Sequence, residues 1–353
     1  MSIDKSLSVK QLLMPLTQFL NDESVTEIVV NKPGQVYVEK HGQWESFESD
    51  DLKVLTYNYL QSLGVAVAAF AGENVMFEST VPILSAVLPG GERAQFVMPP
   101  ACKDGTISIT IRKPSFRIRE LETYASDGFF DKVRPADKTN TIDAELVELY
   151  QHIHDAPNVA GKRLQFLKRC VELNKNIVIA GETGSGKTTF MKSLMQAIPA
   201  QQRIITIEDV PELLYGLPKH DNQVNLFYPS EAKSNASVTA ASLLRSCLRM
   251  KPDRILLAEL RGGETYDFLN VCLSGHGGSI TSCHAGSCSG VFEYLALKVL
   301  QSETGKALPY DVIRKLLYLT IDVVIHIHND RKIGRHITEI WFDPSKKNQG
   351  ESK

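Results

Sequence analysis

Hydrophobic and polar positions alternate in short runs over the first ~110 residues, a pattern typical of half-buried β-strands. Turn-forming pairs such as Pro33-Gly34 and His41-Gly42 separate several of the runs. The strands expected on this basis are 26–31, 35–40, 43–47, 83–88, 93–98 and 107–112. Two helices are also expected, one opening at Ser8 and one running from Ser49 to Gly64. We therefore predict an α+β domain built on an antiparallel sheet over residues 1–113.

The pattern loosens between residues 114 and 161, where Asp, Lys, Pro and Thr cluster at 131–141. This composition predicts a linker with helical pieces. Beyond it the chain alternates between short β-rich runs and helical stretches, which indicates βαβ units and a parallel sheet. The expected strands are 176–180, 203–207, 254–258 and 279–282, with helices at 188–197, 238–249 and 264–273. We expect an α/β domain of the RecA-like P-loop NTPase class over 162–343, followed by a polar tail at 344–353.

Length, net charge and cysteine content exclude some classes of protein. The 353 residues are more than one core usually serves, which agrees with two domains. A net charge of −2 gives no overall basic field, so direct nucleic-acid binding is not predicted. No apolar run approaches the ~18 residues of a spanning helix, and no signal peptide is visible at the start. The six cysteines are scattered, which favours reduced thiols and a cytoplasmic protein.

A complete phosphate-loop motif, GxxxxGK[ST], begins at Gly181 and ends with Lys187-Thr188. An apolar strand precedes it and a helical stretch follows, so backbone N–H groups would surround phosphate oxygens at the positive end of a helix. Lys187 would contact the β- and γ-phosphates, and the Thr188 hydroxyl would bind Mg²⁺. The cofactors expected are therefore ATP and Mg²⁺. The candidate nucleotide-binding residues are Gly181, Glu182, Thr183, Gly184, Ser185, Gly186, Lys187, Thr188 and Thr189.

Acidic residues follow two of the predicted strands, Glu208 after the strand at 203–207 and Glu259 after the strand at 254–258. ATP hydrolysis needs a group that orients and deprotonates water, and carboxylates that hold Mg²⁺. Ala258 stands where an aspartate often precedes this second acid, so Glu259 would act on the metal through a water molecule. An ordinary exposed strand-end carboxylate is the alternative at both positions.

Two histidines, His276 and His284, flank a short strand rich in small residues. At the carboxyl end of that strand, His284 would contact a γ-phosphate and report its presence. A zinc site with the nearby cysteines is one alternative, although the intervals fit no common ligand pattern. Histidines satisfied by the backbone are the other alternative. His326 and His328 alternate on an expected strand and are interpreted as structural.

These motifs in this order resemble the hexameric traffic ATPases of type IV secretion systems. The phosphate loop is followed by an acidic box at 207–212, a segment at 248–264 that ends Glu-Leu-Arg-Gly-Gly-Glu, and a histidine box at 274–285. N-terminal segments at 26–34 and 111–115 also resemble this family. The resemblance covers nearly the whole chain apart from the linker and the tail.

The resemblance implies specific roles. Glu208 matches a candidate general base, Glu259 the Walker B acid and His284 the second histidine of the histidine box. Arg93 and Arg112 match N-terminal arginines that approach the nucleotide, bound between the two domains. The family also implies a homohexamer, other type IV secretion components as partners, and peripheral association with the inner membrane. Its function is to couple ATP hydrolysis to domain motion that drives pilus assembly or the translocation of protein or DNA.

Other possibilities remain open at this stage. Arg245 and Arg249 are possible phosphate-facing cations, or simply a basic helix face. A nucleic-acid motor such as a RecA-like recombinase or helicase shares the loop and the sheet, and it predicts DNA-stimulated hydrolysis. A nucleotide-gated scaffold that does not hydrolyse ATP is a third possibility, which a direct turnover assay decides.

Overall fold

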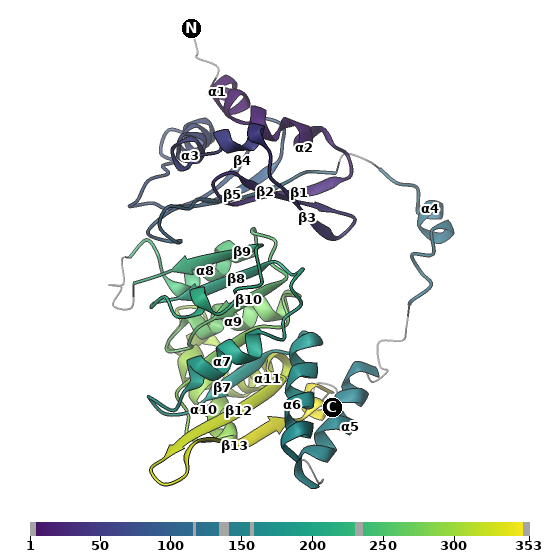
Figure 1. The fold of residues 1–353 in the computed structure, drawn as a ribbon, viewed down its shortest axis with the longest axis vertical. Helices are drawn as coiled ribbons and strands as arrows, with labels where there is room; N and C mark the ends of the chain where they lie inside the picture. The colour runs from purple at the N-terminus through teal and green to yellow at the C-terminus, as the bar shows by residue number, and fades with distance from the viewer. Residues whose placement is uncertain (1–4, 116–117, 134–140, 156–158, 230–235, 349–353) are drawn as a thin grey trace.

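The computed structural model describes residues 5–115, 118–133, 141–155, 159–229 and 236–348. The chain forms two domains, each around a sheet (Figure 1). In this described part, no helix has both the length and the apolar character needed to cross a membrane.

The N-terminal domain is a six-stranded antiparallel sheet in the order β3-β2-β1-β6-β5-β4. Apolar side chains of one face, including Ile28, Val38 and Ile109, pack against the domain's helices. The strands are β1 Val25–Lys32, β2 Gln35–Lys40, β3 Gln43–Phe47, β4 Ile83–Val87, β5 Arg93–Val97 and β6 Ser108–Arg112; the helices are α1 Lys5–Leu12, η1 Met14–Leu16, α2 Thr17–Asn21, η2 Asp50–Val54 and α3 Tyr57–Ala71. The predicted α+β fold is confirmed, with Pro15 in a short 3-10 turn between the first helices.

Helix α3 differs from the predicted one at both ends. It begins at Tyr57, where the Thr56 side chain accepts a hydrogen bond from the Tyr59 N–H, and it continues through Gly64 to Ala71. A Cβ at Gly64 would lie 2.3 Å from the Phe77 ring, so this glycine allows close packing and does not end the helix. The helix continues because Val67 and Ala68 are still buried in the core.

The C-terminal domain is built on a seven-stranded sheet in the order β13-β12-β7-β11-β10-β8-β9, parallel except at β13. Helices cover both faces (Figure 1), and two apolar clusters fill the space on the two sides. The strands are β7 Ile177–Ala180, β8 Ile204–Glu208, β9 Gln223–Phe227, β10 Arg254–Leu257, β11 Ile280–Cys283, β12 Val323–Asp330 and β13 Gly334–Phe342; the helices are α6 Val159–Glu172, α7 Lys187–Met195, η3 Leu213–Tyr215, α8 Ala240–Cys247, α9 Glu264–Leu273, α10 Cys288–Val299, η4 Gly305–Ala307, α11 Tyr310–Thr320 and η5 Pro344–Asn348. This is the predicted α/β architecture.

The predicted linker divides into two parts in the structure. Helix α4 (Leu121–Ser126) stands away from both domains, as Figure 1 shows. Helix α5 (Thr141–Asp155) packs instead on α6, and its Leu146 and Ile153 are fully buried with Phe166. The C-terminal unit therefore begins near residue 141, earlier than the boundary at 162 that the sequence suggested, because the apolar face of α5 completes its core. Residues 116–117, 134–140 and 156–158 of that linker lie outside the described residues.

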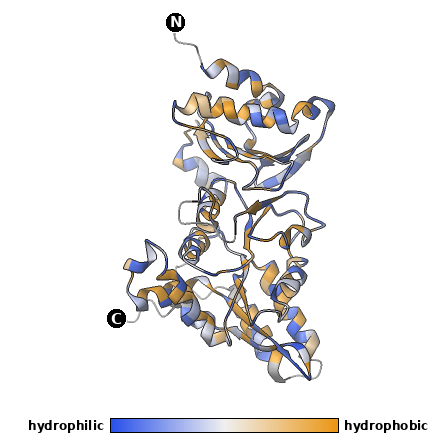
Figure 2. Ribbon diagram, turned by 90° about the vertical axis from the view of Figure 1, so that its left-hand side faces the viewer, coloured by the Kyte–Doolittle hydropathy of each residue, from blue (hydrophilic) through white to orange (hydrophobic). Residues whose placement is uncertain are grey.

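The second face of the N-terminal sheet carries buried polar side chains such as Asn31 and Gln95, which contact the C-terminal domain, and the loop after β5 pairs with strand β9. The Lys103 N–H donates to Asn225 O, and the Phe227 N–H donates to Ala101 O. Arg203, which is fully buried, donates to the side chains of Asn31 and Asn222. The two domains thus share buried polar contacts. Figure 2 shows both domains from a second direction, coloured by residue hydropathy.

Candidate nucleotide-binding site

The phosphate loop joins β7, which is fully buried, to the first turn of α7. Gly181, Gly184 and Gly186 have φ values of 154°, 78° and 95°, a backbone region that side chains with a Cβ adopt rarely. A Cβ at Gly181 would lie 2.3 Å from the Ile327 carbonyl oxygen of β12. These glycines therefore bend the chain so that backbone N–H groups gather at the N-terminus of α7, where an anion is favoured.

Lys187 points back into this loop. Its Nζ donates to Gly181 O at 2.8 Å and to Glu182 O at 3.1 Å, and only 8% of the residue is exposed. Burial lowers the pKa of the ammonium, while the negative charge of Glu259 acts in the opposite direction. The loop thus holds a poorly hydrated cation beside its N–H groups, which suits a polyphosphate.

A cluster of charged side chains lies across the cleft from the loop. Glu259, only 8% exposed, is 2.6 Å from Arg261 Nη2 through Oε2 and 2.7 Å from His284 Nε2 through Oε1. Arg261 also pairs with Asp209, the residue after Glu208. Two of the predicted residues, Glu259 and His284, are therefore brought together beside Lys187 and Thr188 in one cleft of about 560 Å³.

The other predicted acid, Glu208, is not among the residues that line this cleft. It is fully buried, and its carboxylate accepts hydrogen bonds from the N–H groups of Glu212, Leu213 and Leu214 at 2.6–3.0 Å. Burial raises its pKa, and these backbone donors oppose that shift. The side chains that line the cleft are those of Asp209 and Glu212 from the same acidic box. The assignment of Glu208 as general base stays a prediction, and its contacts are those of a group that fixes the turn after β8.

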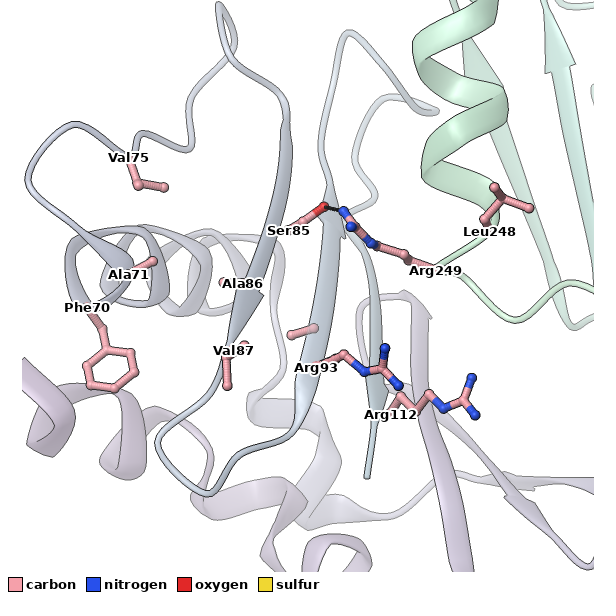
Figure 3. Close-up of a pocket in the computed structure, with 11 residues that line it drawn as sticks. Phe70, Ala71, Val75, Ser85, Ala86, Val87, Arg93, Arg112, Leu248 and Arg249 are labelled. Atoms are coloured by element: carbon pink, nitrogen blue, oxygen red, sulfur yellow. Dashed lines mark hydrogen bonds between the residues drawn. The ribbon is translucent and has the colours of Figure 1, made fainter. Parts of the chain in front are cut away.

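Arg93 and Arg112 line a second cavity of about 650 Å³ between the domains, separate from the phosphate-loop cleft. Arg249 from the end of α8 lies in the same cavity and donates to Ser85 Oγ at 3.0 Å (Figure 3). Arg112 Nε is 3.6 Å from the buried Glu27 carboxylate. Within one chain, these arginines do not meet the phosphate loop.

The family model described as "Type II/IV secretion system protein" matches residues 10–325. The chain belongs to this family. It is 57% identical to the type IV secretion system protein VirB11 of Brucella abortus biovar 1 over 98% of this chain and 93% of that protein. It is 40% identical to the type IV secretion system protein PtlH of Bordetella pertussis over 96% of each chain.

A solved structure is also similar. The crystal structure of the VirB11 ATPase from the Brucella suis type IV secretion system in complex with sulphate superposes with a TM-score of 0.89, at 55% identity and 98% coverage of both chains. The predicted family and the two-domain fold are thus confirmed. This secretion ATPase is therefore an enzyme that hydrolyses ATP.

The side chains of His328 and Arg245 make contacts that differ from those expected from the sequence. His328, interpreted as structural, has its Nδ1 3.3 Å from Glu182 Oε1 on the phosphate loop. The Nδ1 atom of His326 forms a hydrogen bond with the Thr338 hydroxyl on the neighbouring strand β13, which agrees with the interpretation of His326 as a structural residue. Arg245, one of the possible phosphate-facing cations, pairs instead with Asp267 of α9.

Two cations of the cleft were not anticipated. Lys192 follows the phosphate loop by one helical turn, and that spacing was a usable signal. Arg335 lines the same cleft from β13, 151 residues beyond Gly184, whose carbonyl oxygen accepts its Nε hydrogen bond. Nothing in the local sequence around Arg335 points to the phosphate loop.

Proposed function

We propose that this secretion ATPase works as a homohexamer at the cytoplasmic face of the inner membrane, where ATP hydrolysis moves its domains. The motion would drive pilus assembly or the translocation of protein or DNA, in association with other type IV secretion components. The observation that carries the proposal is the cluster of Glu259, Arg261 and His284 beside the phosphate loop.

The residues of the cleft fit a nucleotide with Mg²⁺. The Thr188 hydroxyl would bind the ion directly, and Glu259 would bind it through water. Asp209 and Glu212 add two further carboxylates to the lining of the cleft. Oxygen donors of the kind that Mg²⁺ prefers therefore line the cleft beside the phosphate loop. When bound, the ion would neutralise charge on the β- and γ-phosphates.

Each of the residues that line the cleft would have its own role in ATP binding and hydrolysis. Lys187 and the loop N–H groups would hold the β- and γ-phosphates, and Glu259 would orient and deprotonate the attacking water. His284, in contact with Glu259, would sense the γ-phosphate. Because Glu208 is committed to three backbone N–H groups, Glu259 is the better placed of the two acids for the role of base.

The position of Arg93 and Arg112 supports a ring. Neither arginine approaches the phosphate loop of its own chain, although the family resemblance assigns both to the nucleotide. In a closed ring, a neighbouring subunit would bring this cavity to the nucleotide. An arginine supplied in this way stabilises transition-state charge and links neighbouring sites.

One experiment tests the proposal. Mass by light scattering and ATPase rate would be measured with and without Mg²⁺ and a non-hydrolysable ATP analogue. A hexamer favoured by nucleotide, with turnover abolished by Lys187→Ala, supports the proposal. A strict monomer whose hydrolysis is stimulated by DNA would overturn it and favour a nucleic-acid motor.

A further inference from the structure

The β12–β13 hairpin forms the wall of the phosphate loop that lies away from the acidic cluster. Strand β12 flanks β7 on one side, whereas β11 and β10, which leads to Glu259, lie on the other. The Ile327 carbonyl is so close to Gly181 that no Cβ fits between them, and His328 contacts Glu182. Two successive residues of the loop therefore rest against this hairpin.

Arg335 extends this contact across the loop. Its Nε donates to Gly184 O at 3.1 Å, and its Cδ lies 3.3 Å from where a Cβ of Gly186 would be. The side chain thus touches the loop at two of its glycines and lines the nucleotide cleft with Lys187 and Thr188. A guanidinium has five N–H donors, and the contact with Gly184 uses one of them.

The cations of the cleft differ in what they are bound to. Arg261 is neutralised by Glu259 and Asp209, and the Lys187 ammonium is bonded to two loop carbonyls. Arg335 is exposed, and no carboxylate of the described part of the chain pairs with it. Its charge and its remaining donors are therefore available in the cleft that contains the phosphate loop.

We propose that Arg335 is a nucleotide-positioning residue of this ATPase. Its Nε holds the Gly184 carbonyl on the outer side of the loop, and its terminal N–H groups bind a phosphate oxygen of the nucleotide. A planar guanidinium suits both contacts because its donors are fixed in one fork. The hairpin thereby closes the nucleotide site opposite the acids.

This position predicts a specific kinetic signature. Because Arg335 lies on the wall opposite Glu259, we assign its contact to a phosphate that ATP and ADP both carry, so the contact is made equally with ATP, with ADP and in the transition state. An interaction of this uniform kind changes KM and leaves kcat unchanged. A role in the chemical step would instead lower kcat.

The test compares Arg335→Ala, Arg335→Lys and Arg331→Ala in the full-length protein. Arg331 is an exposed arginine in the turn of the same hairpin and serves as the matched control. We expect Arg335→Ala to raise KM for ATP and Kd for ADP about tenfold, with kcat within twofold of wild type. Arg335→Lys keeps the charge but not the fork, so it should recover part of the loss, and Arg331→Ala should match wild type.

The melting temperature of each variant separates folding from binding. Wild-type KM and Kd in Arg335→Ala would overturn the proposal, as would an equal loss in Arg331→Ala. A fall in kcat at unchanged KM would also overturn it. Should Arg335→Ala unfold, the Arg335→Lys variant alone decides, because a KM raised severalfold at wild-type kcat is the result required.

Discussion

Arg203 of the C-terminal domain donates through Nη1 to the side-chain oxygen of Asn31 in the N-terminal domain at 2.7 Å. The same guanidinium donates to Asn222 and to Met250 O, and it lies over the Trp44 ring. Burial lowers its pKa to about 10. One fully buried cation thus organises the contact between the two domains.

Replacement of Arg203 should destabilise the protein strongly. Arg203→Ala removes the donor to the buried side-chain oxygens of Asn31 and Asn222, of which only that of Asn222 keeps a second donor, and it opens a cavity at a fully buried position. We therefore expect a loss of about 3 kcal/mol in the free energy of unfolding. Urea denaturation followed by circular dichroism would measure this. The exposed Arg331→Ala variant provides the reference, and a loss under about 0.5 kcal/mol for Arg203→Ala would contradict the assigned role.

Glu27 should make stability depend on pH. Burial raises its pKa to about 7, and Arg112, Glu39, Lys251 and Arg203 are the charged groups that face it. Because the folded state then holds a proton that the unfolded state has lost, stability decreases as pH rises from 4.5 to 7. The decrease is at most about 3 kcal/mol.

The Glu27→Gln variant measures this contribution. Its free energy of unfolding should equal that of wild type below pH 4.5 and exceed it increasingly up to pH 7. Unfolding titrations at several pH values, with the exposed Glu78→Gln as control, give the difference directly. A difference independent of pH would show that Glu27 is ionised throughout this range.

Substitutions of Glu259 and of Glu208 should have different effects, the first on the rate of hydrolysis and the second on stability. Glu259→Gln should lower kcat by a factor of at least about 100 while ATP still binds, because the proton acceptor is lost. Glu208→Gln should mainly lower stability, by about 1–3 kcal/mol, because an amide cannot accept from all three backbone donors. ATPase rates and melting curves of both variants distinguish the roles. A stable Glu208→Gln variant without turnover would return the role of base to Glu208.

Gly64→Ala tests the packing of helix α3. A methyl group there would overlap the Phe77 ring, so we expect a loss of about 1–3 kcal/mol in stability although alanine favours helices. Gly72→Ala, where the nearest neighbour would be an ordinary 3.5 Å from the Cβ, is the matched control. Thermal melts of the two variants should therefore differ clearly, and equal melting temperatures would refute this explanation.

What could be predicted from the sequence depended on local patterns. Strands β2 and β3 and helix α9 have the predicted bounds, because alternation and turn residues encode them within a few positions. The phosphate loop was predictable for the same reason. Gly64 was misread because its partner, Phe77, is a tertiary neighbour that no helix rule includes.

In the candidate site, too, some contacts could be predicted from the sequence and others depend on the tertiary structure. Glu259 and His284 follow two neighbouring parallel strands, so their meeting could be expected from the fold. The orientation of Glu208 depends on the turn that follows it, and the contact of Arg335 with Gly184 depends on the path of a distant hairpin. Spacing along the chain carries neither kind of information.

The contact between Ala101–Lys103 and strand β9 has a consequence for handling this protein. Without its N-terminal domain, the C-terminal sheet would end in a bare strand whose N–H and C=O groups at Asn225 and Phe227 lack the partners they have here. An unprotected edge of this kind pairs readily with other chains. The N-terminal domain therefore also protects the β9 edge from pairing with other chains. A domain movement that broke these contacts would expose the edge unless another part of the protein replaced them.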